Sequence, residues 1–106
     1  MPDTSDLFRC LSDPTRRGIF ERLCREGEQT VTVLTAHAGV SQPAVSKHLG
    51  MLRSVGLVEV RQDGRQTHYR PRLAALAPLN DWTQEMTGFW SARMDRLDDL
   101  LNRMDQ

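Results

Sequence analysis

The chain of 106 residues lacks several features that would place it in other classes of protein. No apolar run approaches the roughly 20 residues of a membrane span, and the N-terminus lacks the pattern of a secretion signal. The two cysteines, Cys10 and Cys24, have no neighbouring histidines and form no recognisable zinc pattern. No convincing nucleophile–base pair, glycine-rich phosphate loop or carboxylate pair is present. We therefore expect a small cytoplasmic protein of one domain, 1–106, with no enzyme activity, metal or cofactor.

Net charge is also absent, but the zero total conceals an uneven distribution along the chain. Residues 1–40 carry a net charge of −1, and residues 73–106 carry −3. Residues 41–72 carry six basic side chains against two acidic ones, a net charge of +4. The positive potential is concentrated in the middle of the chain, which suits a nucleic-acid partner for that segment.

Capping residues and helical spacing predict helices in the first forty residues. Apolar side chains at positions 7, 8 and 11 indicate a first short helix. Asp13 and Pro14 begin a second helix, in which Arg16 and Arg17 could touch phosphates or simply face solvent. Thr32 is the expected cap of a third helix, which ends at a glycine just before a fourth helix. Two short helices joined by such a turn are typical of a helix-turn-helix.

The fourth predicted helix, residues 41–54, has two different faces. Apolar residues at 45, 49 and 52 recur at helical spacing and form a buried edge. The remaining face carries small and hydrogen-bonding side chains, which suit base edges and phosphates in a major groove. The candidate DNA-binding residues on this helix are Ser41, Gln42, Pro43, Ser46, Lys47 and, on the flank, His48. Taken singly, each would also fit a solvated helix face.

After the fourth helix, side chains of two kinds alternate from residue to residue, as in β-strands. This period of two predicts a two-stranded wing over residues 57–70, with a tight turn at Asp63-Gly64. Arg65 at its tip suits a narrow minor groove, which attracts guanidinium groups. Arg61, Gln66 and Arg70 are candidates for contacts with phosphates. Arginines on a hairpin also keep an exposed edge soluble, and for Arg61 and Arg70 this explanation is equally good.

A last helix is expected from an Asn80 cap to about residue 104. It carries more apolar surface than the outer helix of a monomer needs, which favours pairing with the same helix of a second subunit. The alternative, that it covers the small core, is compatible with pairing through another face. The expected dimer contacts, including one on the first helix, are Leu7, Trp82, Met86, Phe89, Trp90, Leu97 and Leu101.

Four segments together resemble the ArsR-type family of bacterial repressors, and the resemblance covers nearly the whole chain. It implies a winged helix-turn-helix, mainly α with a small β-hairpin: five helices and a two-stranded wing in a homodimer. It also implies repression of its own or a neighbouring operon, with the fourth helix and wing on operator DNA. The segments are Asp13-Pro14-Thr15-Arg16, Val40-Ser41-Gln42-Pro43-Ala44-Val45-Ser46-Lys47-His48-Leu49, Gly56-Leu57-Val58 and Gly64-Arg65-Gln66-Thr67-His68-Tyr69.

The chain departs from the metal-sensing members of that family. Their third helix carries a Cys-x-Cys pair, whereas residues 33–37 here contain no cysteine and a single histidine, His37. No histidine follows Asp81, where the family's second kind of site needs one. Because soft and borderline metals require thiolate or imidazole ligands, metal sensing is disfavoured and the inducer is unknown.

Two other functions fit parts of the sequence. Cys10 and Cys24 fall on neighbouring predicted helices and could make a thiol-responsive repressor, although both adjoin apolar residues, where cysteine usually acts as a small hydrophobe. A winged helix can also serve as a protein–protein interaction module. The polar face of the fourth helix favours DNA over that alternative.

Overall fold

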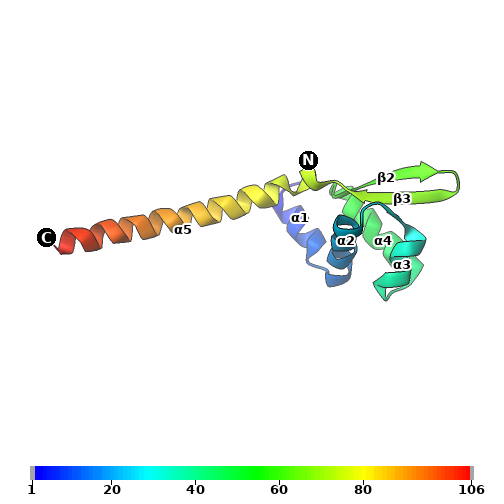
Figure 1. Cartoon of the computed structure of the whole chain (residues 1–106), viewed down its shortest axis with the longest axis horizontal. Coiled ribbons are helices and arrows are strands. Elements are labelled where there is room, and N and C mark those ends of the chain that lie inside the picture. Colours follow the sequence, from blue (N-terminus) through cyan, green and yellow to red (C-terminus); the bar gives the residue numbers. More distant parts are fainter. Residues whose placement is uncertain (1, 106) are drawn as a thin grey trace.

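The computed structural model describes residues 2–105, in which four short helices and a small sheet pack together and a fifth helix projects away (Figure 1). The predicted five α-helices are confirmed, whereas a 3-10 helix (η1) and a first strand were not predicted. The elements are α1 (Thr4–Leu11), α2 (Pro14–Glu26), β1 (Gln29–Thr30), α3 (Val31–Ala38), α4 (Gln42–Ser54), β2 (Val58–Asp63), β3 (Gln66–Pro71), η1 (Leu73–Leu76) and α5 (Ala77–Met104).

Each of the first four helices begins beside a side chain that accepts a hydrogen bond from a backbone amide three residues later. The predicted caps of α2 and α4 are confirmed: Asp13 accepts its bond at 2.8 Å and Ser41 at 3.4 Å. The predicted cap of α3 is wrong, because Thr30 rather than Thr32 accepts the bond. Both positions hold a threonine, so the sequence pattern does not distinguish them.

The sheet has three antiparallel strands in the order β1-β3-β2, where two strands were predicted. The extra strand is only two residues long, so it has no alternation from which to be recognised. In the hairpin, Asp63 pairs with Gln66, so the turn consists of Gly64 and Arg65, one residue later than predicted. Gly64 has a φ of 61°, and a positive φ at the first position of a two-residue turn favours glycine.

The core lies between α1, α2, α3, α4 and the start of β2. The predicted apolar edge of α4 is confirmed, since Val45, Leu49 and Leu52 are all fully buried. Leu7 of α1 is also fully buried inside its own chain. It is therefore unavailable to a partner subunit, and the expectation that it contributes to a dimer is wrong. Its neighbour Phe8 is exposed instead.

One charged side chain, Arg16, is buried among these apolar residues, so neither of the roles expected for it is correct. Its Nε donates a hydrogen bond to the carbonyl of Cys10 at the end of α1. Its Nη1 lies 3.0 Å from Sδ of Met51 and 3.4 Å from Nδ1 of His48, both on α4. Arg16 thus connects three helices.

The fifth helix, α5, begins three residues before the predicted Asn80 cap, with Pro78 in its first turn. Its 28 residues make a rod about 42 Å long at 1.5 Å per residue. Near its start it packs on α1, where the rings of Phe8 and Trp82 meet edge to face with centroids 5.1 Å apart. None of its residues is buried. Among the described helices, none combines the length and apolar character needed to span a membrane.

Candidate nucleic-acid interface

A groove of about 310 Å³ separates the exposed face of α4 from the wing. Gln42 and Ser46 line it from α4, and Arg65 and Gln66 line it from the hairpin. All four side chains are exposed. Predicted DNA-binding residues from two separate segments of the sequence therefore lie around one groove. Their amide, hydroxyl and guanidinium groups face the same space.

The rest of the exposed face of α4 continues this surface. Pro43 and Lys47 are exposed beside the groove. A Cβ added to Gly50, one turn further along, would meet no atom within 4 Å, so this end of the helix surface is open. Ser41 uses its oxygen to cap the helix, which leaves its O–H free to donate a hydrogen bond outward.

His48 differs from these residues because it is half-buried and lies beside Arg16. A guanidinium group can only donate, so the 3.4 Å contact makes Nδ1 of His48 the acceptor. The neutral ring then carries its proton on Nε2. Any hydrogen bond that His48 gives to a phosphate must come from that nitrogen.

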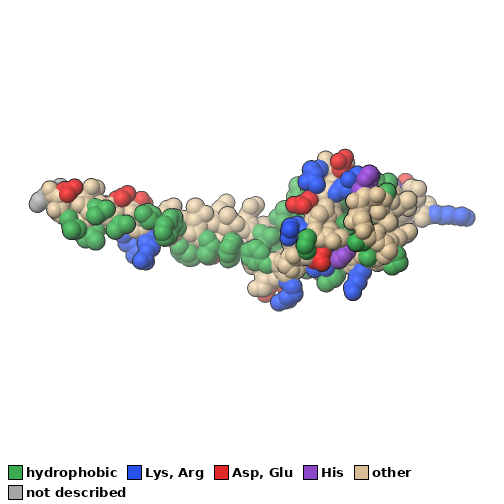
Figure 2. All heavy atoms as spheres, turned by 90° about the horizontal axis from the view of Figure 1, so that it is seen from below, with side chains coloured by type: hydrophobic (Ala, Val, Ile, Leu, Met, Phe, Trp, Pro, Cys, Tyr) green, Lys and Arg blue, Asp and Glu red, His purple; other side chains and the backbone are tan. Residues whose placement is uncertain are grey.

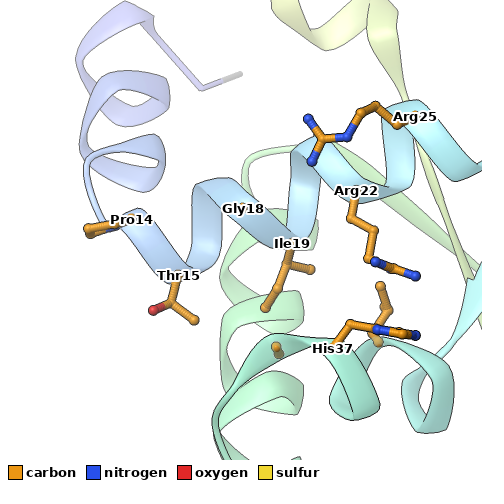
Figure 3. A pocket seen from close by; sticks show the side chains of 9 residues that line it. Pro14, Thr15, Gly18, Ile19, Arg22, Arg25 and His37 are labelled. Carbon is orange, nitrogen blue, oxygen red and sulfur yellow. The ribbon is translucent and has the colours of Figure 1, made fainter.

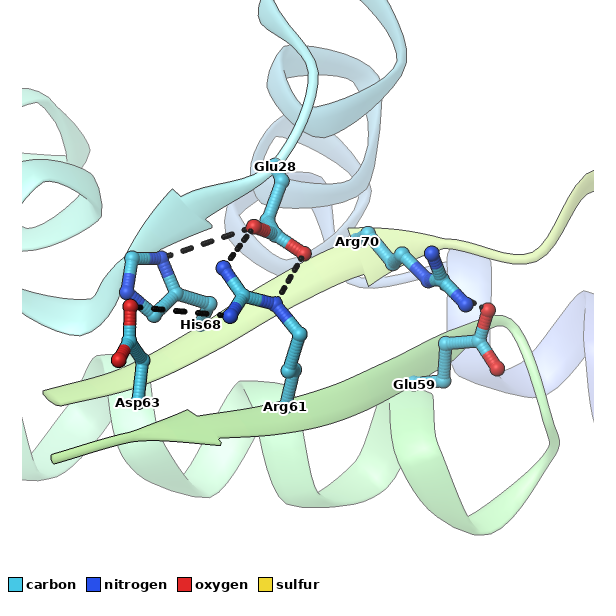
Figure 4. A network of polar contacts seen from close by, with 6 residues as sticks. All are labelled: Glu28, Glu59, Arg61, Asp63, His68 and Arg70. Atoms are coloured by element: carbon cyan, nitrogen blue, oxygen red, sulfur yellow. Dashed lines mark hydrogen bonds and ion pairs between the residues drawn. The ribbon is translucent and has the colours of Figure 1, made fainter.

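Arg61 is engaged within the chain (Figure 4). Its guanidinium forms a bidentate pair with Glu28, with Nη2–Oε2 at 2.7 Å and Nε–Oε1 at 3.3 Å, and lies 3.7 Å from Asp63. The hydrogen bond from Arg61 lowers the pKa of Glu28, and the same contact raises the pKa of Arg61. The wing is thereby tied to the segment before β1, and Arg61 is less available to phosphates than expected.

Two further polar contacts lie on the same sheet (Figure 4). Nε of Arg70 donates to Glu59 at 2.7 Å, and Nδ1 of His68 lies 3.7 Å from Glu28. Within the described residues, Arg65 forms no such pair. Figure 2 shows a basic side chain projecting from the end of the molecule opposite α5. The free positive charge of the wing is therefore at its tip.

Sequence reasoning missed part of the groove. Thr30 and Thr32, at the start of α3, and Thr67 on β3 line it together with Tyr69. Tyr69 packs against the core and also reaches the groove. Nothing in the sequence indicates the bond from Glu28 to the wing, because its partner is 33 residues away.

A stripe of exposed apolar side chains follows α5. Figure 2 shows it as a nearly continuous hydrophobic band along the projecting helix. Phe89 and Trp90 are 66% and 63% exposed, which is unusual for such large apolar groups. Six of the seven residues expected at a dimer contact are exposed on this helix: Trp82, Met86, Phe89, Trp90, Leu97 and Leu101.

The two cysteines, both expected to act as small hydrophobes, differ in their exposure. Cys10 is buried and its Sγ lies 3.7 Å from the carbonyl oxygen of Met51, whereas Cys24 is exposed. Desolvation raises the pKa of both thiols, which disfavours the reactive thiolate. Among the residues described, no group of three or more His, Cys, Asp or Glu side chains could hold a metal ion.

Comparison with known proteins agrees with this geometry. A family model described as a helix-turn-helix domain matches residues 11–61, from the end of α1 into β2. The probable mercury resistance operon repressor of Streptomyces lividans is 44% identical over 82 residues, which cover 74% of this chain and 65% of that protein. The match thus spans slightly less than two thirds of that relative's length.

Solved structures extend the likeness to α5. The ArsR-like transcriptional regulator from Rhodococcus sp. RHA1 has a TM-score of 0.76 and 31% identity, covering 91% of this chain and 90% of that chain. The homodimeric winged helix-turn-helix DNA-binding domain of a possible ArsR-family regulator from Mycobacterium bovis has a TM-score of 0.63 and 27% identity, covering 79% and 77%. Because the Rhodococcus regulator is 31% identical over about nine tenths of both chains, the protein belongs to the ArsR family of winged helix-turn-helix transcriptional regulators.

Proposed function

We propose that this protein is a dimeric repressor that binds an inverted repeat in the operator of its own or a neighbouring operon. The observation that carries the proposal is the groove between α4 and the wing, which gathers Gln42, Ser46, Arg65 and Gln66. Its location in the cell would be the cytoplasm, where bacterial DNA lies.

The exposed face of α4 is suited to the major groove. Gln42 stands in the first turn, and the N-terminal residues of a recognition helix are those that reach base edges. A glutamine side chain can both donate to and accept from adenine, whereas Ser46 and Lys47 can reach base edges or phosphates. The open surface at Gly50 allows close approach of the duplex.

The wing is suited to the neighbouring minor groove. Arg65 is exposed in a two-residue turn and keeps its charge unpaired within the described chain. Narrow, A·T-rich minor grooves have enhanced negative potential, which favours an inserted arginine. The bond between Arg61 and Glu28 would hold the hairpin against the segment between α2 and β1.

The apolar stripe of α5 supports a dimer. In a single chain this stripe would leave two tryptophans, a phenylalanine and several leucines in water, which is unfavourable. Pairing through α5 and Phe8 would cover them and relate two α4 helices by a two-fold axis. Half-sites about 34 Å apart, one turn of the duplex, would then be recognised on one face of the DNA. Metal sensing is not part of the proposal, because α3 carries no cysteine.

Changing Gln42 to alanine tests the placement of α4. Selection of bound sequences from random DNA should give a preferred site for the unchanged protein. The variant should lose preference at one base pair per half-site, by about 1–3 kcal/mol. Gln84→Ala, on the exposed surface of α5, is the matched control and should keep the full preference.

Arg65→Ala should behave differently in the same binding series. Loss of a charge in the minor groove should weaken binding to all sequences and lower the slope of log affinity against log salt by about 1. If Gln42→Ala retains the preference of the unchanged protein at every position, α4 does not read the major groove as proposed.

A further inference from the structure

A second hollow, of about 270 Å³, lies between α2 and α3, away from the groove at the wing. Figure 3 shows Arg22 of α2 pointing toward α3, from which His37 points into the same region. The guanidinium of Arg25 lies at the rim, turned away from His37 in this view. Ile19 and Leu34 form the apolar inner surface. One end of the hollow is therefore basic, and its floor is apolar.

The basic end is not neutralised by neighbouring acids. No carboxylate lines the hollow. Within the described residues, neither Arg22 nor Arg25 forms an ion pair. The side-chain partner of Arg22 is the neutral amide of Gln29, at 3.3 Å from Nε, which leaves its remaining N–H groups available. This contrasts with Arg61 and Arg70, whose charges are paired with glutamates.

Gly18 stands in the middle of α2 and lines the same hollow. Glycine inside a helix is destabilising by about 0.5–1 kcal/mol relative to alanine. No neighbour requires it, because a Cβ at this position would meet no atom within 4 Å, and its φ is not positive. The absence of a side chain leaves the floor of the hollow open at this point.

We propose that the hollow between α2 and α3 binds a small organic anion, a carboxylate or phosphate group on a short apolar body. Arg22 and His37 would hold the oxyanion by charge-assisted hydrogen bonds, and the apolar part would lie over Gly18 against Ile19. The volume is just below the 300–1,000 Å³ range of pockets for drug-sized ligands, which limits the body to a few carbons. A DNA phosphate has the same oxyanion chemistry, so the test separates the two sources.

The test follows amide shifts of the labelled full chain during titration with sodium phosphate or sodium butyrate, against sodium chloride at equal ionic strength. The expected result is a saturable change at Gly18, Arg22 and His37 with both oxyanions and not with chloride. Butyrate should in addition shift the methyl groups of Ile19 and Leu34. Because DNA is absent, the outcome does not depend on the proposed repressor function.

Two variants act on the hollow in different ways. Arg22→Gln should weaken binding of both anions about tenfold or more, whereas Arg9→Gln, a charge loss elsewhere on the surface, should leave it unchanged. Gly18→Leu should fill the floor and abolish binding of butyrate while every arginine remains. If Gly18→Leu does not fold, the comparison of Arg22→Gln with Arg9→Gln decides.

Three results would overturn the proposal. The first is the absence of saturable shifts at these residues, and the second is equal weakening by Arg22→Gln and Arg9→Gln. The third is that free anions do not bind while Arg22→Gln lowers the salt slope of DNA binding by about 1, which would make Arg22 a contact to the DNA backbone.

Discussion

The arginines of this chain differ in what they contact, and those contacts determine what each can do. Arg16 is buried and bonded to the end of α1 and to α4. Arg61 is exposed but held by a carboxylate. Arg65 is exposed and without an ion pair among the described residues, so its full charge faces outward. Of these three, Arg65 is the one available to DNA.

Removing the side chain of Arg16 should destabilise the fold. Arg16→Ala leaves the carbonyl of Cys10 without its donor and empties a space between α1, α2 and α4. We expect the free energy of unfolding in urea to fall by about 2–3 kcal/mol, as for loss of buried hydrogen bonds to a charged group.

Arg53→Ala is the control for this experiment, because Arg53 is exposed on α4 and its loss should change the stability by no more than about 0.5 kcal/mol. Equal effects of the two substitutions would mean that the contacts of Arg16 do not stabilise the packing of the three helices.

At the scale of elements, local chemistry made most helices predictable. Caps at Asp13 and Ser41, the apolar period of α4 and the alternation of the hairpin all act within a few residues along the chain. Errors arose where two equivalent residues compete, as with Thr30 and Thr32. They also arose where the stabilising contact is distant, because β1 exists only through its pairing with β3. The four groove residues come together only through the tertiary structure, so their proximity could not be predicted from the sequence.

The wing illustrates such a distant contact, since Glu28 holds Arg61 across the sheet. The pKa of Glu28 is lowered from its ordinary value of 4.5 by the hydrogen bond from Arg61. A carboxylate with a depressed pKa stabilises the fold above its ordinary pKa, and the contribution is lost as pH falls through the lowered value. The effect belongs to a surface pair, so salt should weaken it.

Glu28→Gln should therefore lower the melting temperature at neutral pH and should do so progressively less as pH falls below about 4.5. Melting curves of the two proteins between acid and neutral pH, at low and high salt, measure this difference. A difference of the same size at pH 3 and pH 7 would show that the pair with Arg61 is not its source.

The whole molecule is 74 Å long because α5 extends away from the other elements. From Trp82 to Met104 the apolar residues of α5 recur about one helical turn apart, so they lie on one side of the helix. None of these residues is buried in a single chain. In the proposed dimer, a second copy related by a two-fold axis would offer the same stripe in return.

Trp90→Glu should separate the subunits. A carboxylate in the middle of an apolar interface would be desolvated without a partner, which is costly. Sedimentation equilibrium should give twice the 12.1 kDa chain mass for the unchanged protein and a mass shifted toward one chain for the variant. Gln84→Glu adds the same charge on the polar side of α5 and should leave the dimer intact. A single-chain mass for the unchanged protein would contradict the pairing.

Hydroxyl-radical footprinting on the selected DNA tests most directly whether paired α4 helices read the duplex. The account predicts two protected half-sites with inverted sequences, centred about 34 Å apart on one face, with additional protection where each Arg65 enters the minor groove. A single protected segment, or uniform protection without a preferred sequence, would contradict it.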